Sequence, residues 1–225
     1  MGILKTITEE YFGKTVRKED EIDIDGLDVE IVSFTDNNGN IHRRGYKPKN
    51  FKNLKELLER MIEKRGEDGD FNDIDTSDIT DMSYLFEEDE TFNGDITGWD
   101  VSKVTDMSFM FGYATSFNQP IGNWKVSKVT DMECMFSNAY SFNQPIGDWK
   151  VSKVTNMNGM FAGATSFNQP IGDWKVSSVK NMSYMFNGAT LFNQPIDNWD
   201  VSGVKDMYRM FLNCPIKDEY KPKMK

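Results

Sequence analysis

Residues 117–132 read FNQPIGNWKVSKVTDM, and residues 142–157 read almost the same, FNQPIGDWKVSKVTNM. All five tryptophans follow this step of 25 residues: Trp99, Trp124, Trp149, Trp174 and Trp199. Phenylalanine keeps the step from Phe92 to Phe192, and methionine keeps it from Met82 to Met207. A fixed period of this kind is typical of proteins that stack one structural unit many times.

The second half of each unit predicts a short helix. In SKVTDMSFMFGYA, residues 102–114, the apolar residues recur at the spacing of one helical face: Val104, Met107, Met110, Phe111 and Ala114. Ser102 is a candidate N-cap at the start. At the far end, one column holds residue types that tolerate the left-handed conformation of a helix stop: Asn138, Gly163, Gly188 and Asn213.

The first half of each unit predicts a turn and a short strand. Pro120 and Gly122 mark the turn, and Trp124 and Val126 then alternate with Lys125 at the period of a strand. We therefore expect an α/β repeat with one strand and one helix per 25-residue coil, in which stacking buries continuous columns of Phe and Trp. A column of asparagines beside the Phe column is expected to pair with backbone groups in the turns: Asn93, Asn118, Asn143, Asn168 and Asn193.

The two ends of the repeats require caps, because an open end exposes apolar columns. Leu27, Val29 and Ile31 alternate with polar residues before the turn sequence TDNNGN, which predicts a β-hairpin. FKNLKELLERMIEKRG (51–66) predicts an amphipathic helix with Asn53 in a capping box. The expected division is an α+β cap at 1–69, about six repeats at 70–214, and a polar tail at 215–225 that shields the other end.

The net charge of −10 excludes some partners. Residues 70–214 carry nine basic and 19 acidic groups, which disfavours nucleic acid and anionic membrane surfaces as ligands. No stretch approaches the roughly 18 apolar residues of a membrane span. MGILKTITEEYFGK lacks the apolar region of a signal peptide, so neither membrane insertion nor export is predicted from the N-terminal residues.

Candidate catalytic and metal-binding residues are few. His42, the only histidine, lies beside two arginines in the hairpin and is interpreted as a solvated residue, so no enzyme activity and no cofactor are expected. Cys134 and Cys214 lie three coils apart, too far for a disulfide, and are predicted to be free. The spacing of one acidic run fits no calcium loop, so we expect a solvated acidic surface there: Asp70, Asp73, Asp75, Asp78 and Asp81.

Two columns carry residues that the repeat does not require. The outward column of the strand reads Asp75, Asp100, Lys125, Lys150, Lys175 and Asp200, and its lysines are candidates for contact with an acidic partner. The outward column of the helix includes Tyr84, Phe109 and Tyr184, with Tyr113 and Tyr140 nearby. Exposed aromatic side chains are frequent anchors of protein interfaces, so these are the stronger partner-binding candidates.

The unit W(D/K)VSxVxxMxxMFxxAxxFNQPI resembles the BspA-like leucine-rich-repeat surface proteins, in particular the 25-residue repeats of mycoplasma lipoproteins; the resemblance covers about residues 47–214. It implies a leucine-rich-repeat-like solenoid, a location on the bacterial cell surface or outside the cell, and adhesion to a protein or cell-surface ligand. The chain departs from that pattern because it has no signal peptide or lipobox cysteine, so a cytoplasmic location also stays open. We therefore expect a binding module, with a self-assembling spacer as the alternative.

Overall fold

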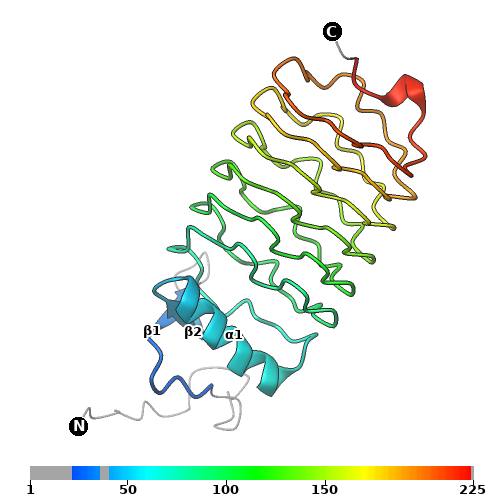
Figure 1. The fold of residues 1–225 in the computed structure, drawn as a ribbon. Helices are drawn as coiled ribbons and strands as arrows, with labels where there is room; N and C mark the ends of the chain where they lie inside the picture. Colours follow the sequence, from blue (N-terminus) through cyan, green and yellow to red (C-terminus); the bar gives the residue numbers. More distant parts are fainter. Residues whose placement is uncertain (1–21, 36–40, 224–225) are drawn as a thin grey trace.

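The computed structural model describes residues 22–35 and 41–223. It has four regular elements: strand β1 (Val29–Thr35), strand β2 (Ile41–Pro48), helix α1 (Phe51–Arg65) and the short 3-10 helix η2 (Asp218–Tyr220). Between α1 and η2, the 25-residue units stack one above the next along a single axis (Figure 1). We call each unit a coil and residues 70–214 the repeat array.

The core of the array consists of aromatic columns that run from coil to coil. Phe111 stacks on Phe136 at 5.6 Å between ring centroids, and Phe117 stacks on Phe142 at 6.0 Å. The two columns also contact each other, since the Phe111 and Phe117 rings lie 3.9 Å apart. All of these rings are fully buried, and each coil obtains its apolar contacts largely from its neighbours.

The helix expected at residues 102–114 is absent. The segment is a series of β-turns, in which Met110 N donates to Met107 O at 3.3 Å and Gly112 N donates to Phe109 O at 3.0 Å. The intervening N–H groups point to the next coil, so that Phe109 N donates to Glu133 O and Phe111 N donates to Met135 O. Because the neighbouring coil supplies these acceptors, the backbone needs no i→i−4 bonds, and the same apolar residues still face the core.

The strand expected at Trp124–Val126 is also absent. Trp124 N donates to Ile121 O within a turn, and the contacts between coils occur elsewhere. Parallel bridges join residues 25 apart along one column, for example Asp106 to Asp131 and Asp131 to Asn156. The pairing between coils therefore falls at the start of the turn segment, where a helix was predicted.

The asparagine column pairs with backbone groups, as predicted. Asn118 N donates to Asn93 Oδ1 at 2.9 Å, and Asn143 N donates to Asn118 Oδ1 at 3.0 Å. The same bond recurs to the end of the array, where Asn193 Oδ1 accepts from Lys217 N. Each amide thus fixes the turn of the following coil, which is an architectural role.

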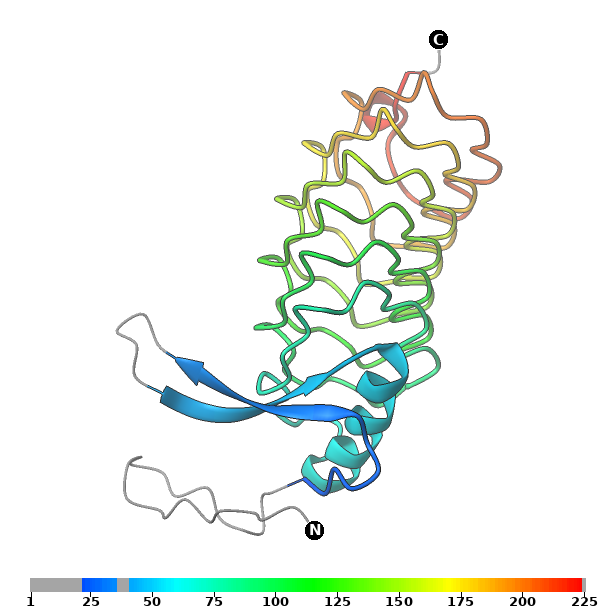
Figure 2. The ribbon, with the colours of Figure 1, turned by 90° about the vertical axis from the view of Figure 1, so that its left-hand side faces the viewer.

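The hairpin and α1 cover the first coil (Figure 2). β1 and β2 pair antiparallel, as the sequence predicted, and Tyr46 of β2 then pairs with the first coil through Tyr46 N to Asp73 O (2.8 Å) and Asp75 N to Tyr46 O (2.9 Å). α1 buries Leu54, Leu57, Leu58 and Met61.

The N-cap of α1 differs from the prediction. It is Asn50, whose side chain accepts from Asn53 N, and it lies three residues before the expected cap Asn53; the helix itself begins at Phe51, as predicted. At the C-terminal end of α1, Arg65 makes two 2.7 Å hydrogen bonds to the buried carboxylate of Asp73 in the first coil.

The C-terminal tail packs on the last coil. Ile216 is buried, Ile196 N donates to Tyr220 O at 3.0 Å, and the Lys221 ammonium lies 5.8 Å from the centre of the Phe211 ring. These contacts cover the Phe column of the last coil.

Candidate functional site

The outward aromatic column of the array consists of Tyr84, Phe109, Cys134, Gly159, Tyr184 and Arg209. All six have a positive φ, between 49° and 61°. They occupy the left-handed position of a turn, which directs each side chain out of the core. Tyr84 and Phe109 stack with ring centroids 4.9 Å apart and planes 6° from parallel. The column therefore brings two of the predicted residues into one aromatic pair.

The other predicted aromatic residues are distributed around this pair. Tyr84, Tyr113 and Tyr140 are each nearly half exposed, whereas Phe109 and Tyr184 are half-buried. Tyr184 lies three coils from Phe109 and instead meets the Tyr208 ring edge-on at 5.5 Å. The structure thus separates a pair near the N-terminal end from a second aromatic contact near the C-terminal end.

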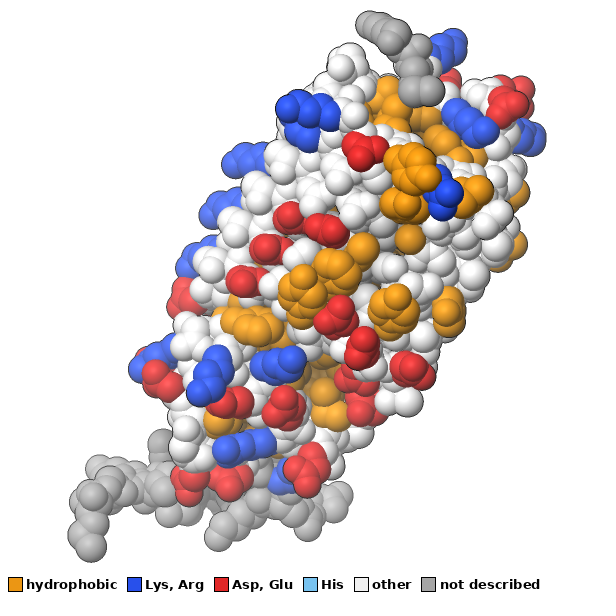
Figure 3. Space-filling model, viewed as in Figure 1, with side chains coloured by type: hydrophobic (Ala, Val, Ile, Leu, Met, Phe, Trp, Pro, Cys, Tyr) orange, Lys and Arg blue, Asp and Glu red, His pale blue; other side chains and the backbone are white. Residues whose placement is uncertain are grey.

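Acidic side chains follow the aromatic pair. Figure 3 shows a row of carboxylates beside the exposed hydrophobic side chains on this face of the array. Partial burial raises the pKa of the Tyr84 hydroxyl, and the charges of Glu87, Glu133 and Asp106 raise it further. The face is therefore both aromatic and negatively charged.

Three exposed apolar residues were missed by the sequence interpretation: Leu191, Tyr208 and Leu212, with exposed fractions of 58%, 54% and 42%. Each replaces a small or polar residue in its own column, as Leu191 does where other coils have Ser or Thr. A search for departures from the repeat, rather than for aromatic residues, would have found them.

The lysine column lies on the surface as predicted. Lys125, Lys150 and Lys175 are exposed, and none forms an ion pair within the part of the chain that the structure describes. At the same position in other coils an aspartate accepts a hydrogen bond from the N–H two residues on, as Asp100 Oδ1 does from Ser102 N at 2.9 Å.

Several carboxylates of the acidic run in the first coil form ion pairs with basic side chains of the protein. Asp73 binds Arg65, Asp75 and Asp78 bind Lys47, and Asp78 also binds Lys103 at 2.6 Å. Hydrogen bonding to Lys103 and then to Lys47 lowers the pKa of Asp78 to about 2. Among the described residues, no group of three or more His, Cys, Asp or Glu side chains is arranged to hold a metal ion.

Both cysteines are free, as predicted. Burial raises the pKa of the Cys134 thiol to about 11, and burial also raises that of Cys214. Cys214 is half-buried at the edge of the core, with Sγ 3.5 Å from Phe192 O. The side chain of His42 lies outside the described part of the structure.

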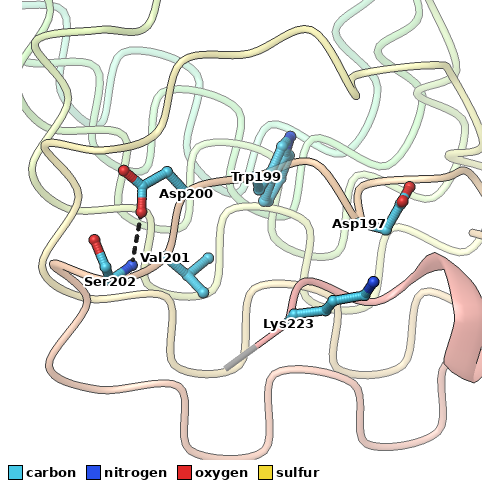
Figure 4. Close-up of a pocket in the computed structure, with 6 residues that line it drawn as sticks. All are labelled: Asp197, Trp199, Asp200, Val201, Ser202 and Lys223. Carbon is cyan, nitrogen blue, oxygen red and sulfur yellow. Dashed lines mark hydrogen bonds between the residues drawn. The ribbon is translucent and has the colours of Figure 1, made fainter. Parts of the chain in front are cut away.

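A shallow pocket lies where the tail meets the last coil (Figure 4). It is lined by Asp197, Trp199, Asp200, Val201, Ser202 and Lys223. The Asp200 carboxylate in this pocket accepts a 3.1 Å hydrogen bond from Ser202 N, so it is already engaged in the turn. The pocket is open and offers a ligand little enclosed surface.

Residues 52–161 and 144–218 match the family described as "Mycoplasma protein of unknown function, DUF285". The chain belongs to this family. No curated protein and no solved structure matches the chain. Together the two matched ranges cover all but the first residue of α1 and the whole repeat array. None of the helices that the structure describes is long and apolar enough to cross a membrane.

Proposed function

We propose that this chain is a non-enzymatic binding module whose stacked coils act as a leucine-rich-repeat-like solenoid that contacts a protein or cell-surface ligand. The mycoplasma family and the resemblance to BspA-like surface proteins support a role in adhesion at the bacterial surface. Binding would occur by contact over an extended face, with no bond chemistry.

The observation that carries this proposal is the stacked pair of Tyr84 and Phe109. Neither ring belongs to the core, and other coils place Gly159 or Arg209 at the same position without loss of the backbone conformation. Tyr113, in the same coil as Phe109, adds a third ring that is nearly half exposed. Aromatic side chains that the scaffold does not require, surrounded by acidic groups, are suited to anchor a protein partner.

A cell-binding assay tests the proposal. Labelled protein is titrated onto intact host-type cells, and the wild type is compared with Tyr84→Asn/Phe109→Asn, because Asn tolerates the left-handed backbone. We expect the double variant to bind about tenfold or more weakly, since central aromatic anchors contribute about 2 kcal/mol or more. Tyr208→Ser at the far end serves as the control. Equal binding by the wild type and the double variant would show that the aromatic pair is not part of the binding site.

Self-assembly is the second candidate, and the last coil favours it. In inner coils, alternate N–H groups donate to the next coil, as Phe186 N does to Met210 O. The equivalent N–H groups of Met207, Arg209, Phe211 and Asn213 make no such bond within the described residues. Open edges of this kind can pair with another chain. Sedimentation over a hundredfold concentration range distinguishes the two functions, because a monomer at all concentrations would exclude assembly.

A further inference from the structure

We infer that the lysine-bearing edge of the array is a binding surface for a linear anionic polysaccharide. This goes beyond the proposed function, because the surface is separate from the aromatic pair and takes a ligand of different chemistry. The surface consists of two lysine rows, defined as Lys125, Lys150 and Lys175 in one column and Lys128 and Lys153 in another.

The lysines of the first row replace residues that help the turn. Asp75, Asp100 and Asp200 each accept a hydrogen bond from the N–H of the serine two residues later, at 2.9 to 3.1 Å. Lysine has no acceptor, so the N–H groups of Ser127, Ser152 and Ser177 have no partner within the described chain. Three successive coils thus give up a stabilising hydrogen bond at one position.

The lysines also lie close to one another and form no ion pairs among the described residues. After hydrogen bonding to Ser102, the charges of Lys125 and Lys103 lower the pKa of Asp100 in the preceding coil. Coils joined by backbone hydrogen bonds are about 4.8 Å apart, so neighbouring lysines of one row repel. Lys103 shares a column with Lys128 and Lys153 and is paired with Asp78, whereas Lys128 and Lys153 make no ion pair in the described part of the chain. Asp148 and Asp173 lie two residues before Lys150 and Lys175 and form no ion pair with them. An external anion would relieve this repulsion.

The surroundings of the lysines indicate which kind of anion fits. The exposed large hydrophobic residues of the described chain all lie elsewhere, and the exposed neighbours of the rows include Ser127, Ser152, Thr130 and Thr155. Protein interfaces contain an apolar centre, which this surface lacks. A hydrated polymer with hydroxyl and sulfate or carboxylate groups needs only cations and hydroxyl partners.

The shape of the surface favours a linear polymer over a membrane. The rows follow the stacking axis, and basic side chains line one edge of the array in Figure 3. A row of carboxylates follows the neighbouring face. These carboxylates would repel an anionic membrane surface, which is broad, but they leave room for one polysaccharide chain along the lysine-bearing edge. The geometry therefore fits a polymer that runs parallel to the array.

The test is a fluorescence-anisotropy titration of a labelled heparin oligosaccharide with the full chain at several salt concentrations. We expect binding that weakens steadily with salt, because each lysine contact releases counterions. The variant Lys125→Gln/Lys150→Gln/Lys175→Gln should bind at least about tenfold more weakly. The matched control, Lys49→Gln/Lys52→Gln/Lys55→Gln, removes the same charge near α1 and should bind within about twofold of wild type.

A second variant separates binding from folding. Lys125→Asp/Lys150→Asp/Lys175→Asp should melt at or above the wild-type temperature, since it restores the turn hydrogen bonds, and it should not bind heparin. Tyr84→Asn/Phe109→Asn should bind heparin as the wild type does, which keeps this test independent of the proposed function. Unchanged affinity of the Gln variant, or an equal loss in the control, would overturn the inference. Lysine-dependent binding to phosphatidylserine vesicles without binding to heparin would overturn the choice of polysaccharide.

Discussion

Asn118 Oδ1 accepts a 3.0 Å hydrogen bond from the backbone N–H of Asn143, 25 residues later in the chain. The same side chain also accepts from Gln144 Nε2 at 3.1 Å. This relationship explains why the phrase FNQ returns in successive coils: each asparagine holds the turn of the coil that follows. The repeated residues therefore maintain the stack, and contact with other molecules falls to the residues that vary.

Removal of one amide from this column should destabilise the array. Asn143→Ala removes the side-chain acceptor of Asn168 N, whereas Gln169 Nε2 keeps its bond to Asn143 O; loss of such a partly buried hydrogen bond costs about 1 kcal/mol. Urea denaturation followed by tryptophan fluorescence measures the loss. Asn143→Asp keeps the acceptor oxygen and should therefore lose less stability. Equal losses of stability in both variants would contradict the assigned role of the Asn143 side chain.

The next coil approaches closely at Gly147. A Cβ added at this position would lie 2.5 Å from Pro170 O, which is backbone and cannot move aside. We expect Gly147→Ala to destabilise the chain by about 1–3 kcal/mol, as overpacking generally does. The last coil already carries Asp197 in the same column, so Asp197→Ala should have a small effect in the same urea titration. If Gly147→Ala left the free energy of unfolding unchanged, neighbouring coils would be able to separate locally.

The pH dependence of the N-terminal cap should follow Asp78. Its pKa of about 2 in the folded protein lies below the usual carboxyl value of 3.8, so its ion pairs with Lys103 and Lys47 stabilise the folded state above about pH 4. That contribution is lost as the pH falls toward 2. In thermal melts, Asp78→Asn should therefore be less stable than wild type at pH 6, and the difference should shrink by pH 2.5. A difference independent of pH would exclude the carboxylate as its cause.

The thiol of Cys134 should react slowly. Burial raises its pKa to about 11, so the thiolate population at pH 8 is about a thousandfold below that of the thiol. Intact-mass analysis after iodoacetamide treatment should show modification of the native protein far more slowly than of the urea-unfolded protein. The variant Cys134→Ser identifies the contribution of Cys214, and non-reducing analysis should show two free thiols. Rapid alkylation of Cys134 in the native protein would contradict its burial.

The sequence by itself determined the period of 25, the buried columns, the hairpin, the amphipathic character of α1 and the left-handed position shared by Asn138 and Gly163, because these depend on residue type and spacing. Only the tertiary structure decided the backbone of each coil. The apolar spacing of Val104, Met107 and Phe111 fits a helix and a series of stacked turns equally well. The choice depends on whether alternate N–H groups find acceptors in their own segment or in the next coil, and those acceptors exist only once the coils have stacked. The stack likewise brought Tyr84 against Phe109 across 25 residues of sequence.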